Sequence, residues 1–298
     1  MAPTAIKDIF PTHDKLPTED TTLYYYLELK DGGIIQTYPG TAFEKRRKHV
    51  PHDVTVKDMR SVRDQFNINN AGFELVDHKS AVKDFTDAKE VEQVYYAEYI
   101  DFIKKRVGGA DRLTHVSEGH AAQGLDDKIP VKVMNPARFV HVDQSYRGAE
   151  QILFLNLPEE EAERRMKKRW AIINVWAPII KPVKRDPVAF ADFRSIDEYD
   201  FRTVVANLPP PDAAEYGKAA ARYEVTNLAH NPNQQWYYAS DMTPEEAWVF
   251  MIFDSKNDGR AKCAVHTFFP YQNQDDYGEP RTSVEVRCFV FWDDKETE

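Results

Sequence analysis

The second half of the chain is divided into short segments rich in Val, Ile, Phe and Trp, each as long as a single β-strand. These segments are residues 139–144, 171–176, 247–254, 263–269 and 283–292. Turns or longer insertions separate them, which is typical of antiparallel strands. The longest apolar run, 247–253, is far too short to cross a bilayer. The pattern therefore favours a β-barrel or jelly roll for this half of the protein.

Helical patterns precede and interrupt these strands. Apolar residues recur at spacings of three and four over 81–85 and 91–105, which predicts two helices. A third helix is predicted over 159–168, where glutamates open the segment and Arg and Lys close it, the order that the helix dipole favours. Near the N-terminus, 23–30 and 34–38 are predicted as two strands joined by a hairpin turn at 31–33. Together these patterns predict an α+β fold in which helices brace a β-barrel or jelly roll.

The composition limits the classes of partner. Of the 298 residues, 42% are hydrophobic, which is enough to bury a full core and excludes a disordered chain. The formal net charge of −10 makes nucleic acid and anionic membranes poor partners, because both demand a basic surface. Cys263 and Cys288 alone cannot build a zinc–thiolate site, and no secretory signal is visible at the N-terminus. We expect a cytoplasmic protein that binds a small molecule or a metal ion.

One histidine–carboxylate pair is the leading candidate for a site, since the common phosphate-binding, dinucleotide, serine-hydrolase and zinc-protease motifs are absent. His141 and Asp143 lie two residues apart in a predicted strand, so their side chains point to the same face. An imidazole and a carboxylate on one wall of a barrel supply two members of the two-His–one-carboxylate triad that binds Fe(II). The spacing alone is a weak signal, because a chain with nine His and 49 acidic residues is expected to contain a His followed two positions later by an acidic residue by chance.

A third ligand has to come from a later strand. His266 is the one later histidine that a predicted strand contains, and a buried core histidine is the alternative interpretation. Arg281 and Ser283 open the last strand, where an arginine and a hydroxyl would anchor the free end of a dicarboxylate that chelates the metal. Arg287 shares a strand face with Ser283 and Glu285. Either Arg287 pairs with Glu285 or with an external acid, or that face is exposed to solvent.

Taken together, these residues resemble the Fe(II)/2-oxoglutarate-dependent dioxygenases. The flanking sequence is similar to the fungal and bacterial hydroxylase/desaturase group, which includes proteins like the cephalosporin 7α-methoxylase small subunit and oxygenases of secondary metabolism. The stretches that carry this resemblance are residues 58–60, 70–75, 135–145, 173–179, 236–238, 253–255, 266–269 and 281–287. They span most of the chain. Two positions depart from the pattern, since Ala177 stands where the group has an arginine and Met251 where it has a lysine.

The resemblance implies one domain over residues 1–298, folded as a double-stranded β-helix, or jelly roll, braced by helices. Residues 1–130 would form N-terminal strands and bracing helices, and 131–298 would form the jelly-roll core. A long insertion between barrel strands is expected at about 182–244. Its stretches at 209–211 and 231–233 are predicted to be loop, and the insertion would cover the active site as a lid.

The resemblance also implies the chemistry. The three candidate ligands would hold Fe(II), 2-oxoglutarate would chelate the iron, and dioxygen would take the remaining position. The distal carboxylate of 2-oxoglutarate would lie on Arg281 and Ser283, with Arg287 left open as a second candidate anchor. Oxidation of an unactivated C–H bond would then give hydroxylation, desaturation or oxidative ring closure. The two departures at 177 and 251 lie outside the triad and bear on the substrate rather than on iron.

The substrate is expected to be a small metabolite, with an amino acid or a small carboxylic acid as one class. Candidate substrate-binding residues are Arg287, Asn174, Trp176 and Tyr238, and core packing is the alternative for Trp176. Two other functions remain open at this point. One is an iron oxidase or isomerase on the same barrel that uses no 2-oxoglutarate, and the other is a noncatalytic jelly-roll binding subunit. The oligomeric state is also open, with a homodimer as one option.

Overall fold

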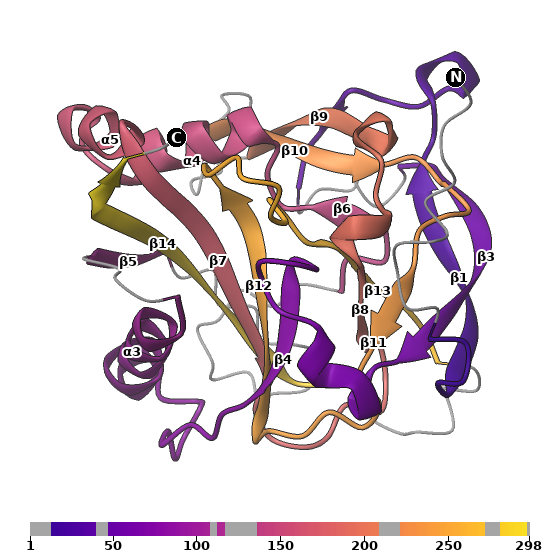
Figure 1. The fold of residues 1–298 in the computed structure, drawn as a ribbon, viewed down its shortest axis with the longest axis horizontal. Helices are drawn as coiled ribbons and strands as arrows, with labels where there is room; N and C mark the ends of the chain where they lie inside the picture. The colour runs from indigo at the N-terminus through magenta and orange to yellow at the C-terminus, as the bar shows by residue number, and fades with distance from the viewer. Residues whose placement is uncertain are drawn as a thin grey trace.

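The computed structural model describes residues 13–39, 47–107, 112–116, 136–208, 221–271 and 281–296. Within these ranges the strands form two sheets that pack face to face (Figure 1). Aromatic side chains from both sheets fill the space between them; for example, the rings of Phe190 and Phe250 lie 5.1 Å apart. This arrangement confirms the predicted jelly roll braced by helices.

The larger sheet has nine strands in the order β1-β3-β11-β8-β13-β6-β10-β9-β2. Most neighbours are antiparallel, but β11 pairs with β3 and β2 pairs with β9 in parallel. The strands are β1 (Thr18–Tyr26), β2 (Gln36–Thr37), β3 (His49–Asp58), β6 (His141–Val142), β8 (Val188–Ala191), β9 (Phe201–Leu208), β10 (Ala221–Leu228), β11 (Trp236–Tyr238) and β13 (Val265–Phe268).

The smaller sheet has five antiparallel strands in the order β4-β12-β7-β14-β5. Its strands are β4 (Phe73–Asp77), β5 (Arg112–Val116), β7 (Lys168–Pro178), β12 (Glu246–Asp254) and β14 (Ser283–Glu296). Both faces of β7 and β12 are buried, which explains why their sequences are apolar runs rather than alternating patterns. Every second residue of β7 and β14 therefore points into the barrel, and the others point to its outer face.

Helices cover the outside of the barrel. Ahead of α3 (Tyr96–Val107) lie α2 (Ala88–Glu90) and a π-helical turn over Val91–Tyr95, and α3 packs on the outer face of the smaller sheet (Figure 1). On the larger sheet, α4 (Tyr146–Asn156) lies against β10 and is followed by α5 (Glu159–Met166). The predicted helices over 91–105 and 159–168 are thus confirmed. Short 3-10 helices occupy Leu29–Asp31, Arg60–Gln65, Phe193–Ser195 and Glu198–Asp200.

Two local predictions were wrong. The strands over 23–30 and 34–38 do not form a hairpin, because β1 pairs with β3 and β2 pairs with β9, partners that no local pattern reveals. Residues 81–85 are not helical. In addition, α4 was not predicted, although Ser145 caps it by accepting a hydrogen bond from the Gly148 amide at 2.9 Å.

The segment 182–244, expected to be an insertion between barrel strands, contains four strands of the larger sheet, β8 to β11. Two of them, β8 and β11, are buried throughout their length. The segment is therefore part of the barrel wall rather than an insertion between its strands, while 231–233, predicted to be loop, contains no strand. The proline run at 209–211 lies outside the described residues. The division of the chain into the ranges 1–130 and 131–298 stays a prediction.

Candidate metal centre

His141, Asp143 and His266 lie together, although the last is far from the first two in the sequence. Strand β6 pairs with β13 through a single antiparallel position that sets His141 opposite His266. The Nε2 atoms of His141 and His266 lie 3.4 Å and 3.7 Å from Oδ1 of Asp143. One ligand atom from each of the three residues lies within 4.8 Å of the others. The predicted convergence of these side chains is thus present in the structure.

Backbone hydrogen bonds fix which ring nitrogen of each histidine faces the cluster. The Nδ1–H of His141 donates to the carbonyl of Phe139 at 2.8 Å, and that of His266 donates to the carbonyl of Ala264 at 3.1 Å. A carbonyl can only accept, so Nδ1 carries the proton in both neutral rings and Nε2 keeps a free lone pair. This arrangement is typical of histidines that bind metals, whose second nitrogen is held by an outer partner.

His266 is packed deeply among aromatic rings. Its ring lies 5.1 Å from that of Phe250 and 5.7 Å from that of Phe190. Burial, with a smaller contribution from His141, lowers the pKa of His266 to about 4. The imidazole is therefore neutral near pH 7, which is the form that binds a metal.

The second carboxylate oxygen of Asp143 is occupied by two donors. Arg287 Nη2 donates to Oδ2 at 2.7 Å, and Asn174 Nδ2 donates to the same oxygen at 2.9 Å. Burial alone raises the pKa of Asp143, but the positive charge of Arg287 is the largest opposing influence, and this pKa lies well below its usual range. The carboxylate is therefore ionised and turns Oδ1 toward the two imidazoles.

Arg281 is the second feature of the site. Its guanidinium is buried against the rings of Phe268 and Trp176, 4.2 Å and 4.9 Å from their centroids. It donates to the carbonyl of Asp186 at 2.9 Å and to the hydroxyl of Ser283. Asp186 and Glu285 attract it electrostatically, but no carboxylate among the described residues forms an ion pair with it. Burial lowers the pKa of Arg281 to about 10, so it stays charged near pH 7 and favours the arrival of an anion.

The pairing of β7 with β14 places the remaining candidates in one row inside the barrel. Arg287 is opposite Asn174, and Glu285 is opposite Trp176. Arg287 and Asn174 hold Asp143, while Trp176 supports the Arg281 guanidinium. The expected role of these residues in substrate binding stays a prediction, and for Arg287 and Asn174 the structure shows a different contact. The open question about Arg287 is answered in part, since it pairs with Asp143 and lies 3.8 Å from Glu285.

Tyr238 is not part of this row. It is buried on β11, where its ring makes edge contacts with those of Phe269 and Tyr271. Burial, reinforced by the nearby carboxylates, raises the pKa of its hydroxyl. Its described ring contacts are with Phe269 and Tyr271 and not with the three candidate ligands, so its predicted role at the mouth of the site stays a prediction.

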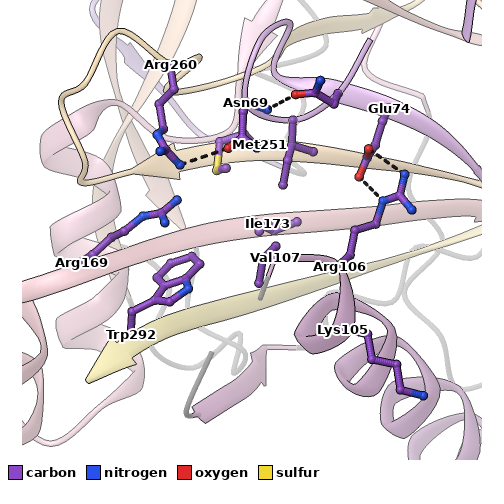
Figure 2. Close-up of a pocket in the computed structure, with 12 residues that line it drawn as sticks. Asn69, Glu74, Lys105, Arg106, Val107, Arg169, Ile173, Met251, Arg260 and Trp292 are labelled. Atoms are coloured by element: carbon purple, nitrogen blue, oxygen red, sulfur yellow. Dashed lines mark hydrogen bonds and ion pairs between the residues drawn. The ribbon is translucent and has the colours of Figure 1, made fainter. Parts of the chain in front are cut away.

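A cavity of about 480 Å³ lies elsewhere, on the outer face of the smaller sheet near the end of α3 (Figure 2). Ile173 lines it, whereas the neighbouring Asn174 points into the barrel toward Asp143. Its arginines are ion-paired: Arg106 with Glu74, Arg169 with Asp254 and Arg260 with Asp258. This cavity is separated from the metal centre by the thickness of the sheet.

Sequence reasoning missed several residues around the site. Phe190 and Phe250 pack against the ring of His266. The carbonyls of Phe139 and Ala264 orient the rings of His141 and His266. Backbone carbonyls leave no mark in residue type. One regularity was nevertheless available, because each carbonyl belongs to the residue two positions before its histidine.

Comparisons with known proteins agree with this geometry. Residues 23–291 match the family described as "Oxidoreductase/YMDC permease-like domain". The hydroxylase/desaturase efuI of Hormonema carpetanum is 38% identical over 293 residues, covering 95% of this chain and 98% of efuI. The hydroxylase/desaturase CTB9 of Cercospora beticola is 38% identical over 294 residues, covering 95% of this chain and 89% of CTB9. The solved structure of the iron and alpha-ketoglutarate-dependent endoperoxidase NvfI superposes with a TM-score of 0.75 at 25% identity, over 92% of this chain and 97% of NvfI.

The chain belongs to the Fe(II)/2-oxoglutarate-dependent hydroxylase/desaturase family. It is therefore an oxidoreductase of the dioxygenase class, and the resemblance noted in the sequence is confirmed. In the described part of the chain, no helix is both long enough and apolar enough to span a membrane.

Proposed function

We propose that His141, Asp143 and His266 hold Fe(II), and that Arg281 with Ser283 binds the distal carboxylate of 2-oxoglutarate. The observation that carries this proposal is the convergence of two free imidazole nitrogens and one carboxylate oxygen. This donor set suits Fe(II), because two neutral imidazoles and one carboxylate leave positions open for other ligands. Iron, 2-oxoglutarate and dioxygen together supply the oxidising power that removes hydrogen from an unactivated carbon.

Arg281 fits the distal end of the cosubstrate for an electrostatic reason. A buried guanidinium without a carboxylate partner has lost its hydration, and an incoming carboxylate restores the missing interaction. Its planar donors match a carboxylate with two parallel hydrogen bonds, and the Ser283 hydroxyl is positioned beside them. Phe268 and Trp176 keep water away from this pair, which strengthens the attraction.

The substrate is a small organic metabolite, and hydroxylation, desaturation and oxidative ring closure are the outcomes in question. The names of the relatives, hydroxylase/desaturase and endoperoxidase, cover several oxidations on this type of site. The chain contributes the placement of the target carbon and the exclusion of water, which the aromatic walls beside His266 support. The cytoplasmic location, the homodimer and the absence of nucleic-acid or membrane partners stay predictions.

The ligand assignment is tested by anaerobic titration of the metal-free protein with Fe(II) and 2-oxoglutarate, followed by visible absorption. We expect a weak charge-transfer band in the wild-type protein and none in His141→Ala or His266→Ala. His52→Ala is a matched control, because His52 stacks on His230 and makes no contact with the candidate ligands. An unchanged band in His266→Ala would refute the assignment.

The cosubstrate is tested by succinate release against a panel of amino acids and small metabolites. We expect substrate-dependent succinate release by the wild-type protein, with strong loss in Arg281→Met. Oxidation without succinate that is insensitive to Arg281→Met would instead indicate an iron oxidase or isomerase. A wild-type chain that binds no iron would indicate a binding subunit.

A further inference from the structure

We propose that Asn174 and Arg287 are positioning residues that restrict Asp143 to a single ligating oxygen. Iron would then retain the coordination positions that the cosubstrate and dioxygen need. This inference rests on the metal ligands proposed above and goes beyond them, because neither Asn174 nor Arg287 would touch the metal.

The two oxygens of Asp143 have different surroundings. Oδ2 accepts from Arg287 Nη2 at 2.7 Å and from Asn174 Nδ2 at 2.9 Å. Oδ1 faces the Nε2 atoms of His141 and His266 at 3.4 Å and 3.7 Å. Two short hydrogen bonds, one of them charge-assisted, occupy the lone pairs that Oδ2 would need in order to reach a metal. The geometry thus leaves Oδ1 as the ligating atom.

The donors themselves are held rigidly. Arg287 Nε donates to Oδ1 of Asn174 at 3.1 Å, which closes a ring of hydrogen bonds through Asp143. Asn174 Nδ2 also donates to Glu285 Oε1 at 2.6 Å. Asn174 is fully buried and Arg287 is 5% exposed. Because Arg287 and Asn174 sit opposite each other in the β7–β14 ladder, the sheet sets the position of both side chains.

The consequence concerns how many positions the protein takes on the metal. A carboxylate can bind a metal through one oxygen or through both. With one oxygen, the two histidines and Asp143 supply three ligand atoms and leave open positions for a chelating cosubstrate and for dioxygen. With both oxygens, Asp143 would occupy one of those positions. Removal of a hydrogen-bonding partner behind a metal ligand typically weakens metal affinity about 10- to 100-fold.

The test uses the full chain, with Co(II) as a spectroscopic probe for Fe(II). The variants are Arg287→Met, Arg287→Lys and Asn174→Leu, measured for Co(II) affinity, visible Co(II) absorption and 2-oxoglutarate affinity of the Co(II)-loaded protein. We expect Arg287→Met and Asn174→Leu to weaken Co(II) binding about 10- to 100-fold, to change the absorption spectrum and to weaken 2-oxoglutarate binding. Arg287→Lys keeps the charge without the second hydrogen bond, so we expect partial recovery.

Arg169→Met is the matched control. Arg169 is also ion-paired, with Nη2 2.7 Å from Asp254, and its side chain is 12% exposed, but it lies on the outer face of the same sheet beside Trp292 (Figure 2). Its loss should destabilise the fold without changing the Co(II) spectrum or affinity. If Arg287→Met does not fold, Arg287→Lys and Asn174→Leu carry the test.

The outcomes separate this inference from the ligand assignment. If His266→Ala loses Co(II) while the folded Arg287 and Asn174 variants keep wild-type affinity and spectrum, the positioning role is refuted and the ligands stand. If His266→Ala binds Co(II) as the wild type does, the proposed ligands themselves are refuted. An Arg169→Met variant with the same spectral change as Arg287→Met would also overturn the positioning role, because the effect would then follow from lost stability.

Discussion

Replacing Arg281 by Met should separate stability from cosubstrate binding. The substitution removes a buried charge that has no carboxylate partner, and this relieves a desolvation cost of several kcal/mol. It also removes the hydrogen bonds to Asp186 and Ser283 and the cation–π contacts with Phe268 and Trp176. These losses are of similar size, since charged hydrogen bonds contribute about 1.5–3 kcal/mol each and cation–π contacts about 1–2 kcal/mol. We therefore expect the free energy of unfolding of the metal-free protein to change by no more than about 2 kcal/mol.

The bound state should respond far more strongly. A desolvated charge pair between Arg281 and the distal carboxylate contributes at least about 3 kcal/mol, which corresponds to a loss on the order of 100-fold in affinity for 2-oxoglutarate. The assay is calorimetric titration of the Co(II)-loaded protein with 2-oxoglutarate, together with urea unfolding of the metal-free protein. In the Co(II)-loaded wild type, 2-oxoglutarate at 100 times its Kd should add about 2.7 kcal/mol of stability, and in Co(II)-loaded Arg281→Met this gain should nearly vanish.

A second arginine gives the opposite expectation. Arg169→Met removes the nearest partner of Asp254, which is almost fully buried and keeps the more distant Arg260, 3.6 Å away. We expect a loss of about 3–5 kcal/mol of stability with unchanged 2-oxoglutarate affinity.

The reasoning is refuted if Arg281→Met binds 2-oxoglutarate within about threefold of wild type, an effect below about 0.7 kcal/mol. It is also refuted if Arg281→Met destabilises the metal-free protein as much as Arg169→Met does.

Three further predictions concern the support of the site. Burial lowers the pKa of both His266 and His49 to about 4, so the unfolded chain takes up protons near pH 6.5 while the folded protein stays neutral. The free energy of unfolding of the metal-free protein is therefore greatest above pH 6.5 and falls by up to about 3 kcal/mol per imidazole toward pH 4. In urea unfolding, His49→Gln should make this fall with pH less steep. A pH dependence unchanged from wild type contradicts the prediction. Gly72 has φ 91°, and a Cβ there would lie 2.6 Å from the carbonyl oxygen of Cys263. Gly72→Ala should therefore lower the free energy of unfolding by about 1–3 kcal/mol, measured by thermal unfolding, and should weaken Co(II) binding. A Gly72→Ala variant with wild-type stability would contradict this. Phe190→Ala should cost about 3–5 kcal/mol and loosen His266, measured as lower stability with a weaker charge-transfer band, and Phe190→Leu should restore part of both.

The convergence of His141, Asp143 and His266 could be predicted from sequence because it depends on residue types and on spacing within single strands. The period of two in a strand places His141 and Asp143 on one face, and His266 was the one later histidine in a predicted strand. Arg281 and Ser283 were likewise placed beside each other by strand period, and the structure shows their hydrogen bond. These inferences needed residue chemistry and spacing but no knowledge of which strands pair.

What could not be predicted depends on pairing between distant strands. Arg287 was assigned to a substrate or cosubstrate because its partner, Asn174, lies on a strand whose register with β14 is invisible in the sequence. The N-terminal hairpin was wrong for the same reason, since β1 pairs with β3 rather than with its neighbour. The capping serine at 145 was, by contrast, a local signal that would have revealed α4.

The hydrogen-bond ring around Asp143 has a consequence for the order in which the molecule matures. Asp143 and Arg287 are 144 residues apart, and Asn174 joins them from a third segment. Contacts of such long range form only after the intervening chain has been ordered, and they are characteristic of slowly folding β-proteins. The ligand geometry therefore exists only once β6, β7, β13 and β14 have all docked. Iron supplied earlier would meet separate histidines and carboxylates, so metal loading should act as a late report of complete folding rather than as a nucleus for it.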